Sequence, residues 1–141
     1  MNFIVFSGIS ESFNKAIISA CLEKTNYRDY FVNRDPSNCM ALNFIQDKID
    51  TIEQMDEYIG FLNYFKEGVD LAVLITCDNE ALEKRFADYN KIFTSNESFL
   101  ERQEVIKQYF DKAKYQNCIE INATDKTVDQ CVKLIINKLE E

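Results

Sequence analysis

The stretch VDLAVLIT at residues 69–76 constrains the fold more than any other part of the sequence. It is apolar almost throughout and rich in β-branched residues, which is typical of a central strand that is covered on both faces. Such strands belong to parallel sheets, because the crossover helices of these sheets pack on both sides. Shorter segments at residues 2–7, 30–33 and 117–122 also have strand character. The sequence therefore predicts a parallel sheet of about four strands.

Helical patterns alternate with these strands, since apolar residues recur at a spacing of three to four residues. The helical segments are residues 12–24, a segment from residue 38 that follows a turn at Pro36, residues 51–67, a segment with Leu82 and Phe86, residues 97–115, and a last helix that Thr124 introduces. Thr51 with Gln54 has the form of a capping box. The alternation predicts a three-layer α/β fold with helices on both faces of the sheet. Because no linker-like stretch divides the 141 residues, we expect one domain over residues 1–141.

Composition excludes several classes of function. A formal net charge of −8, with Lys and Arg interspersed among Asp and Glu, argues against nucleic-acid binding, against anionic membranes and against nucleic-acid mimicry. There is no leader-like segment and no apolar run long enough to span a bilayer, so we expect no membrane association. Five scattered cysteines without a C-x-x-C pair predict reduced thiols and a cytoplasmic location. The absence of histidine from the sequence predicts no zinc site.

The N-terminal stretch FSGISESFNKA resembles a phosphate-binding loop that is out of register. In a doubly wound sheet, a strand, a glycine turn and a helix N-terminus aim backbone amides at an anion. A working loop reads G-x-x-x-x-G-K-[ST], with the lysine on the outer phosphates and the hydroxyl on magnesium. In this sequence Phe13 replaces the second glycine, Asn14 takes the lysine position, Lys15 comes one residue late, and no Ser or Thr follows. The candidate phosphate-binding residues are Gly8, Ser10, Ser12, Asn14, Lys15 and Arg34.

Several segments resemble, in order, the thymidylate kinase family of nucleoside monophosphate kinases. They are NFIVFSGISES, FVNRDPSNCMALNFIQDKI, VDLAVLITCDNEALEKRF, SFLERQEVIKQYFDKA and IEINATDKTVDQCVKLI. The resemblance implies that Arg34-Asp35-Pro36 lies beside a monophosphate substrate and that Asp70-Leu71 opens a strand. It also implies that Arg85 lies on the helix entering a lid, and that Asn122-Ala123-Thr124 forms a turn near an adenine.

The chain also departs from that family. Relatives are longer and carry a further parallel strand, ending in an aspartate-arginine-aromatic motif, where this chain passes directly into VDLAVLIT. Lid arginines beyond Arg85 are absent as well. If that strand is missing, the second and first strands should pair directly, giving the spatial order second, first, third, fourth. Phosphoryl transfer depends on positive charge placed around the moving phosphoryl group, so efficient catalysis is not expected.

Two functions follow as hypotheses. The first is a degenerate nucleotide-kinase-like protein that binds a nucleotide or phosphate, has lost or nearly lost kinase activity, and acts through a protein partner or as a homo-oligomer. The second is a minimal deoxynucleoside monophosphate kinase that uses ATP and magnesium, with Lys15, Arg34 and Arg85 as catalytic residues. Simpler roles stay open for each residue: a solvated lysine for Lys15, an exposed turn arginine for Arg34, and a packed, acid-paired arginine for Arg85.

Overall fold

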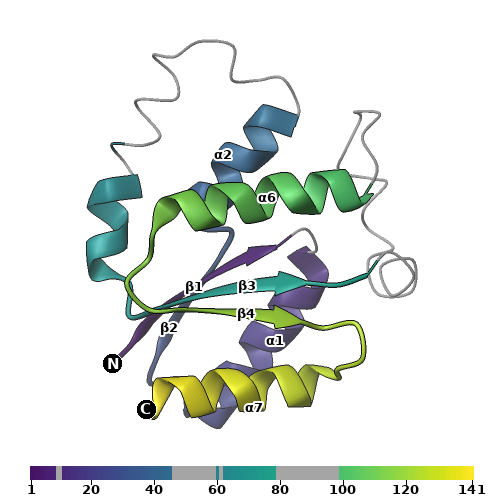
Figure 1. Cartoon of the computed structure of the whole chain (residues 1–141). Helices are drawn as coiled ribbons and strands as arrows, with labels where there is room; N and C mark the ends of the chain where they lie inside the picture. The colour runs from purple at the N-terminus through teal and green to yellow at the C-terminus, as the bar shows by residue number, and fades with distance from the viewer. Residues whose placement is uncertain (9–10, 46–59, 61, 79–98) are drawn as a thin grey trace.

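Four parallel strands form the sheet of this protein (Figure 1). The computed structural model describes residues 1–8, 11–45, 60, 62–78 and 99–141. The strands are β1 (Phe3–Gly8), β2 (Tyr30–Asn33), β3 (Leu71–Thr76) and β4 (Cys118–Asn122). All three pairings are parallel, which confirms the four strands predicted from the sequence.

The order of the strands is β2-β1-β3-β4, as predicted. β1 lies between β2 and β3, so that Ile4 has Phe31 as its partner on one side and Leu71 on the other. Direct pairing of β1 with β2 places the ends of these two strands next to each other. Since the strands are parallel, the turns that follow them emerge at the same edge of the sheet.

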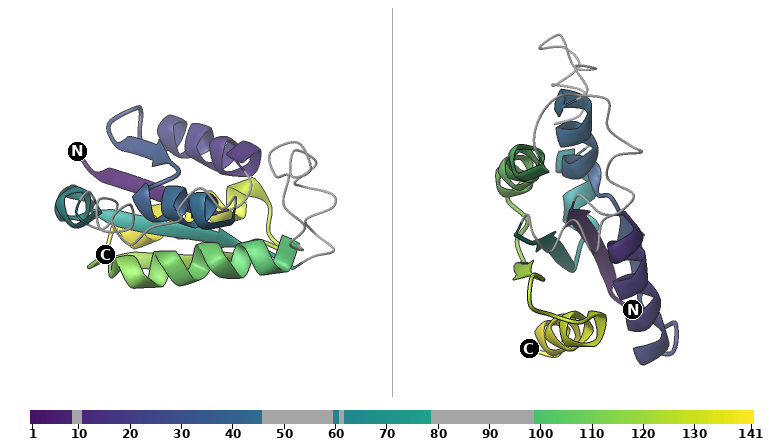
Figure 2. Two further views of the ribbon diagram at one scale, coloured as in Figure 1. Left: turned by 90° about the horizontal axis from the view of Figure 1, so that it is seen from above. Right: turned by 90° about the vertical axis from the view of Figure 1, so that its right-hand side faces the viewer.

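Helices cover both faces of the sheet, which makes the fold a three-layer α/β arrangement (Figures 1 and 2). α1 (Glu11–Lys24) packs beside α7 (Val128–Leu139) on one face, and α2 (Pro36–Ile45) packs beside α6 (Phe99–Ala113) on the other. A 3₁₀ turn, η1 (Lys66–Gly68), leads into β3. The predicted helix with Leu82 and Arg85 and the Thr51–Gln54 capping box lie outside the described residues.

The core consists of apolar side chains from the sheet and from one stripe of each covering helix. All six residues of β3 are buried, as expected for a strand covered on both faces. The helices contribute Ile17, Ile106 and Ile135, which are fully buried. Each such side chain adds about 1.5–3 kcal/mol of hydrophobic stabilisation. Ala16 shares the apolar spacing of α1 but is exposed, so the buried stripe of that helix is narrower than the sequence pattern.

Two helix starts differ from the sequence predictions. α2 begins at Pro36 rather than at residue 38, because proline fits the first helical position, where no backbone donor is needed. α7 is capped by Thr127 rather than introduced by Thr124: the Thr127 hydroxyl accepts from the Gln130 amide, and the Gln130 side chain bonds back to the Thr127 amide. Thr124 is engaged elsewhere, in the turn that follows β4.

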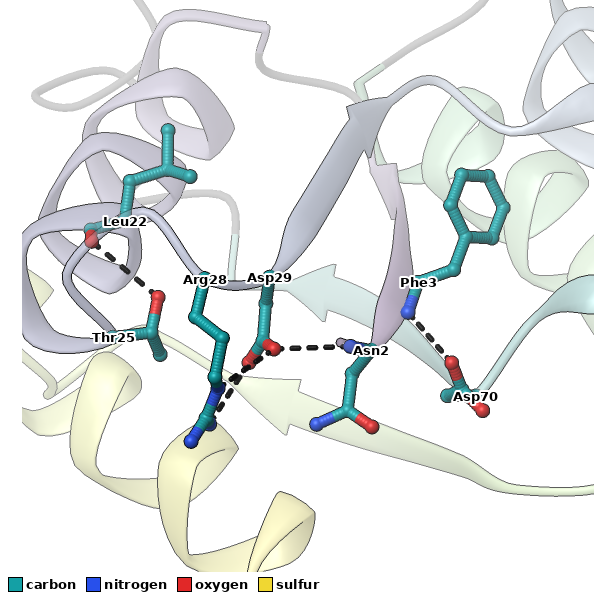
Figure 3. Close-up of polar contacts among 7 residues, drawn as sticks. All are labelled: Asn2, Phe3, Leu22, Thr25, Arg28, Asp29 and Asp70. Atoms are coloured by element: carbon teal, nitrogen blue, oxygen red, sulfur yellow. Dashed lines mark hydrogen bonds and ion pairs between the residues drawn. The ribbon is translucent and has the colours of Figure 1, made fainter.

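Two aspartates hold the beginning of β1 (Figure 3). The Asn2 amide donates to Asp29 Oδ1 at 3.0 Å, and the Phe3 amide donates to Asp70 Oδ2 at 2.6 Å. Burial by itself raises the pKa of Asp29, but hydrogen bonds from the Arg28 guanidinium and from the Asn2 amide outweigh it and hold the pKa below its ordinary value. These contacts lie at the start of the strands, at the opposite end of the sheet from the β1–α1 turn.

Among the helices that the structure describes, none combines the length and the apolar character needed to cross a membrane.

Candidate functional site

The turn between β1 and α1 is where the sequence predicts a phosphate site. Gly8 ends β1 with a φ of 156°, and a Cβ at this position would lie 3.0 Å from the Ile75 carbonyl oxygen and 3.2 Å from Asn14 Nδ2. Only a residue without a side chain fits so close to the end of β3 and to the first turns of α1. The glycine is therefore explained by close packing of the backbone, whatever binds at the turn.

Asn38, on the first turn of α2, binds to the end of β1. Its Oδ1 accepts from the Gly8 amide at 2.7 Å and from Ser7 Oγ at 2.9 Å. Asn38 and Ser7 are fully buried. The Gly8 amide, one of the donors that a phosphate-binding turn offers to an anion, is thus taken by a side chain of the protein. Sequence reasoning missed Asn38, because nothing in the pattern links α2 to this turn.

Asn14 occupies the lysine position of the phosphate-loop motif, and its side chain is turned into the protein. The residue is only 1% exposed, and Nδ2 donates to Asn33 Oδ1, at the end of β2, over 3.3 Å. An asparagine in this place carries no charge and ties α1 to β2. Lys15, the next residue, is exposed, as is Ser12.

Two amide atoms in this cluster have no hydrogen-bond partner among the residues that the structure describes. They are Asn14 Oδ1, an acceptor, and Asn38 Nδ2, a donor. Buried polar atoms are rarely left without a partner, because each such atom costs about 1–3 kcal/mol. Both side chains lie near Gly8: Asn38 accepts from the Gly8 amide, and Asn14 Nδ2 lies 3.2 Å from the place that a Cβ on Gly8 would take.

In the Arg34-Asp35-Pro36 turn, Arg34 is partly exposed, whereas Asp35 and Pro36 are buried. Arg34 is partly exposed and has a φ of 62°, in the left-handed region that non-glycine residues seldom adopt. The Asp35 amide donates to the Phe6 carbonyl oxygen at 3.0 Å, which places this turn against β1. Of the predicted cations that the structure describes, Arg34 and Lys15 therefore follow two neighbouring strands at one edge of the sheet.

Asp35 is fully buried and acts as the cap of α2. Its carboxyl accepts from the amides of Ser37 and Asn38, at 3.3 and 3.1 Å, and from Ser37 Oγ at 2.6 Å. The Tyr115 hydroxyl donates a further hydrogen bond to it. Burial raises the pKa of Asp35, and these hydrogen bonds offset only part of that rise. With its oxygens engaged in this way, Asp35 has a structural role as the cap of α2.

The ends of β3 and β4 carry a second set of polar contacts at the same edge. Asn122 Oδ1 accepts from the Thr124 amide at 3.1 Å and from Thr124 Oγ1 at 2.6 Å, and Thr124 Oγ1 accepts from the Asp78 amide at 2.8 Å. The Gln103 side chain bonds both the amide and the carbonyl of Cys77, at 2.9 and 3.0 Å. These side chains bind one another and the backbone, so they fix the two strand ends together.

The structure thus brings some of the predicted site residues together and separates others. Gly8 and Asn14 lie close together, since a Cβ on Gly8 would stand 3.2 Å from Asn14 Nδ2, whereas Ser12 and Lys15 are exposed to solvent. Ser10 and Arg85 lie outside the described residues. Within the described parts of the chain, no group of three or more Cys, Asp or Glu residues could hold a metal ion.

A groove of about 590 Å³ lies between α1 and α7, on the face of the sheet opposite α2 and α6. Its lining combines apolar side chains, including Val132 and Ile136, with charged ones such as Lys24 and Asp129. None of the predicted phosphate-binding residues that the structure describes lines it. The groove is therefore separate from the β1–α1 turn.

Comparisons of this chain with protein-family models, with curated proteins and with solved structures found no match.

Proposed function

We propose that this chain is a degenerate nucleotide-kinase-like protein, which binds a nucleotide or phosphate at the β1–α1 turn and has lost or nearly lost phosphoryl transfer. One observation carries the proposal: Asn14, at the lysine position of the motif, is buried and bonded to Asn33. A side chain held in this way supplies neither charge nor reach toward a phosphoryl group. The fold, with its turn at the carboxyl ends of parallel strands, supports a ligand site at this edge.

The charges at this edge support binding better than catalysis. Phosphoryl transfer needs cations and a metal around the moving group, and removing one such electrostatic contact costs about a hundredfold or more in rate. Arg34 and Lys15 are the predicted cations at the described part of this edge, and Asp35 is engaged as a helix cap. A helix N-terminus and one or two cations suffice to hold an anion.

We further propose that the protein works in the cytoplasm through a protein partner, as an inhibitor, adaptor or structural subunit, or through its own copies. The five cysteines form no disulfide with one another, and Cys21, Cys77 and Cys131 are buried. Burial raises the pKa of Cys21 to about 12, with a smaller contribution from the neighbouring Cys131, so this thiol stays protonated at neutral pH. Protonated, buried thiols fit a reducing compartment.

The second candidate is a minimal deoxynucleoside monophosphate kinase that transfers phosphate from ATP with magnesium. The observation in its favour is that Lys15 follows β1 and Arg34 follows β2, which are adjacent parallel strands. Two cations at one edge could hold the two phosphate groups of a phosphoryl transfer. However, Lys15 stands one residue later than the lysine of the motif, and the hydroxyl residue that binds magnesium in the motif is missing.

A coupled assay with ATP, magnesium and each deoxynucleoside monophosphate separates the two candidates. We expect calorimetry to show nucleotide binding to the wild-type protein while turnover stays at the background of a protein-free reaction. Arg34→Ala should then weaken binding. Turnover that disappears in Lys15→Ala or Arg34→Ala would instead establish the kinase. Absence of heat with every nucleotide would leave a purely structural or interaction role.

A further inference from the structure

The groove between α1 and α7 continues into a second hollow along α7. The first part, of about 590 Å³, and the second, of about 200 Å³, share Lys24 and Ile136 among their lining residues. On α7 the lining residues begin at Asp129 and reach Leu139, a distance of about 15 Å at the rise of an α-helix. The two parts together, which we call the α1–α7 groove, are therefore as long as about three turns of another helix.

The apolar side chains of the α1–α7 groove follow the periodicity of α7. Val132, Ile136 and Leu139 line it at i, i+4 and i+7, so they lie on one face of the helix. Ala20 lines it from α1. Ile136 and Leu139 are only partly buried by the rest of the protein. A ridge of side chains from a third helix fits between two packed helices, and apolar residues on that ridge would cover this lining.

Charged residues of both signs line the groove from both helices. α1 contributes Glu23 and Lys24, and α7 contributes Asp129 and Lys133. Within the described parts of the chain, none of these four side chains forms an ion pair or a side-chain hydrogen bond. A helix that carried charges of one sign only would meet a like charge from α1 and another from α7. Charge complementarity therefore favours a helix with both acidic and basic residues.

We propose that the α1–α7 groove binds an amphipathic helix of a partner protein, whose apolar stripe is flanked by both acidic and basic residues. This inference rests on the proposed function, because it names the surface through which the protein would act on its partner. The groove is concave, so the same groove of a second copy does not fill it, whereas a helix presents a convex ridge of side chains. None of the predicted phosphate-binding residues that the structure describes lines the groove, so partner and nucleotide would not compete for them.

The test uses synthetic peptides as probes and NMR spectra of the isotope-labelled full chain in about 0.15 M salt. The first probe has about 15 residues, with leucines at i, i+3, i+4 and i+7 flanked by glutamates and lysines. The second probe has lysines in place of the glutamates. We expect the first probe to shift the amide signals of Ala20, Val132 and Ile136. It should bind about two- to fivefold more tightly than the second, because Lys24 and Lys133 repel added lysines. The net charge of −8 by itself predicts the opposite order.

Two substitutions on α7 separate the groove from the rest of the helix. Ile136→Gln changes a side chain that lines both parts of the groove, so affinity for the first probe should fall about tenfold. Leu134→Gln makes the same kind of change at a residue that is 38% exposed and lines neither part, so affinity should stay unchanged. Circular dichroism confirms that each variant is folded, and the comparison of the two probes on the wild-type protein stands even if Ile136→Gln fails to fold.

The outcomes separate this proposal from the proposed function. Absence of binding, shifts confined to residues outside the groove, or equal or tighter binding of the second probe would overturn the proposal. A wild-type dimer in analytical ultracentrifugation that Ile136→Gln dissociates would assign the groove to a second copy instead. If the wild-type protein binds the first probe but no nucleotide, the nucleotide part of the proposed function fails while this proposal stands.

Discussion

The hydroxyl of Tyr115 donates a hydrogen bond to the carboxyl of Asp35, which lies 80 residues earlier in the chain. Asp35 caps α2 on one face of the sheet, and Tyr115 follows α6 on the same face. Both side chains are buried. The contact therefore joins the start of one covering helix to the end of the other, at a point where water cannot replace either partner.

Replacing Tyr115 with Phe should destabilise the protein by about 1–3 kcal/mol, because a buried carboxyl loses one of its donors. The ring and its packing against Phe110, at 5.6 Å between centroids, are retained, so the loss reports the hydroxyl alone. Urea unfolding monitored by circular dichroism measures the change. Tyr64→Phe removes a hydroxyl from a side chain that is 82% exposed and should change stability by less than about 0.5 kcal/mol. Equal stability of the two variants would refute a role for the Tyr115 hydroxyl.

Asp29 should make the protein more sensitive to acid. Its pKa is held below the ordinary value in the folded protein, because hydrogen bonds from Arg28 and the Asn2 amide outweigh the effect of burial. A carboxyl with a lowered folded pKa contributes stability above its unfolded pKa, which is about 3.9, and this contribution is lost as the pH falls through the folded pKa. Asp29→Asn should therefore be less stable than wild type at pH 7, and the difference should shrink below about pH 4.

Urea unfolding at pH 7 and at pH 3 checks this prediction. Asp125→Asn, a change at an exposed residue in the β4–α7 turn, serves as the control and should follow the wild-type protein at both values. A stability difference between wild type and Asp29→Asn that is the same at pH 3 and pH 7 would show that the carboxyl charge of Asp29 contributes nothing.

Gly8→Ala should destabilise the fold by about 1–3 kcal/mol. The added Cβ would meet the Ile75 carbonyl oxygen at 3.0 Å, and the φ of 156° is one that side-chain-bearing residues rarely adopt. Gly68→Ala is the matched control, because a Cβ there has no atom within 4 Å. That variant should be neutral or slightly more stable, since alanine restricts the unfolded chain. Thermal unfolding of both proteins compares them, and a Gly8→Ala protein as stable as the control would contradict the close packing described for this turn.

Two substitutions of Arg34 separate its backbone from its guanidinium. The left-handed φ of 62° costs a residue with a side chain about 1–2 kcal/mol, and glycine avoids this cost at the expense of a more flexible unfolded chain. Arg34→Gly should therefore be more stable than Arg34→Ala by about 0.5–1 kcal/mol. Both lack the guanidinium, so both should lose nucleotide affinity to the same extent. Different affinities for the two variants would show that the conformation of the turn, and not the guanidinium, controls binding.

The strands could be predicted because each is a short apolar run bounded by polar residues or turns. VDLAVLIT is apolar on both faces, and burial on both faces is what a central parallel strand requires. The strand order was predicted from the resemblance to the thymidylate kinase family, because this sequence lacks the further strand that relatives carry before the segment of β3. The helix starts were predicted less accurately, because more than one residue near Pro36 and near Thr127 can begin a helix.

For the candidate site, the sequence predicted several residues but not the contacts that they make. Gly8, Asn14 and Lys15 were identified from the motif, and the structure places Asn14 close to Gly8. Asn38 and Tyr115 were not, because their partners lie 30 to 80 residues away in sequence. Hydrogen bonds between distant residues leave no periodic signal, and the same asparagine on a helix is compatible with solvent exposure.

The amino-acid sequence by itself determined the layers of this protein and the edge of the sheet at which the predicted site residues lie, because apolar periodicity and turn residues act locally along the chain. Only the tertiary structure decided which side chains at that edge form hydrogen bonds with one another. Packing α2 against β1 buried Asn38 beside Gly8, and packing α1 against β2 turned Asn14 toward Asn33. Which polar atoms are paired is set by how helices and strands pack together, because the two partners of each of these hydrogen bonds come from different elements of the fold.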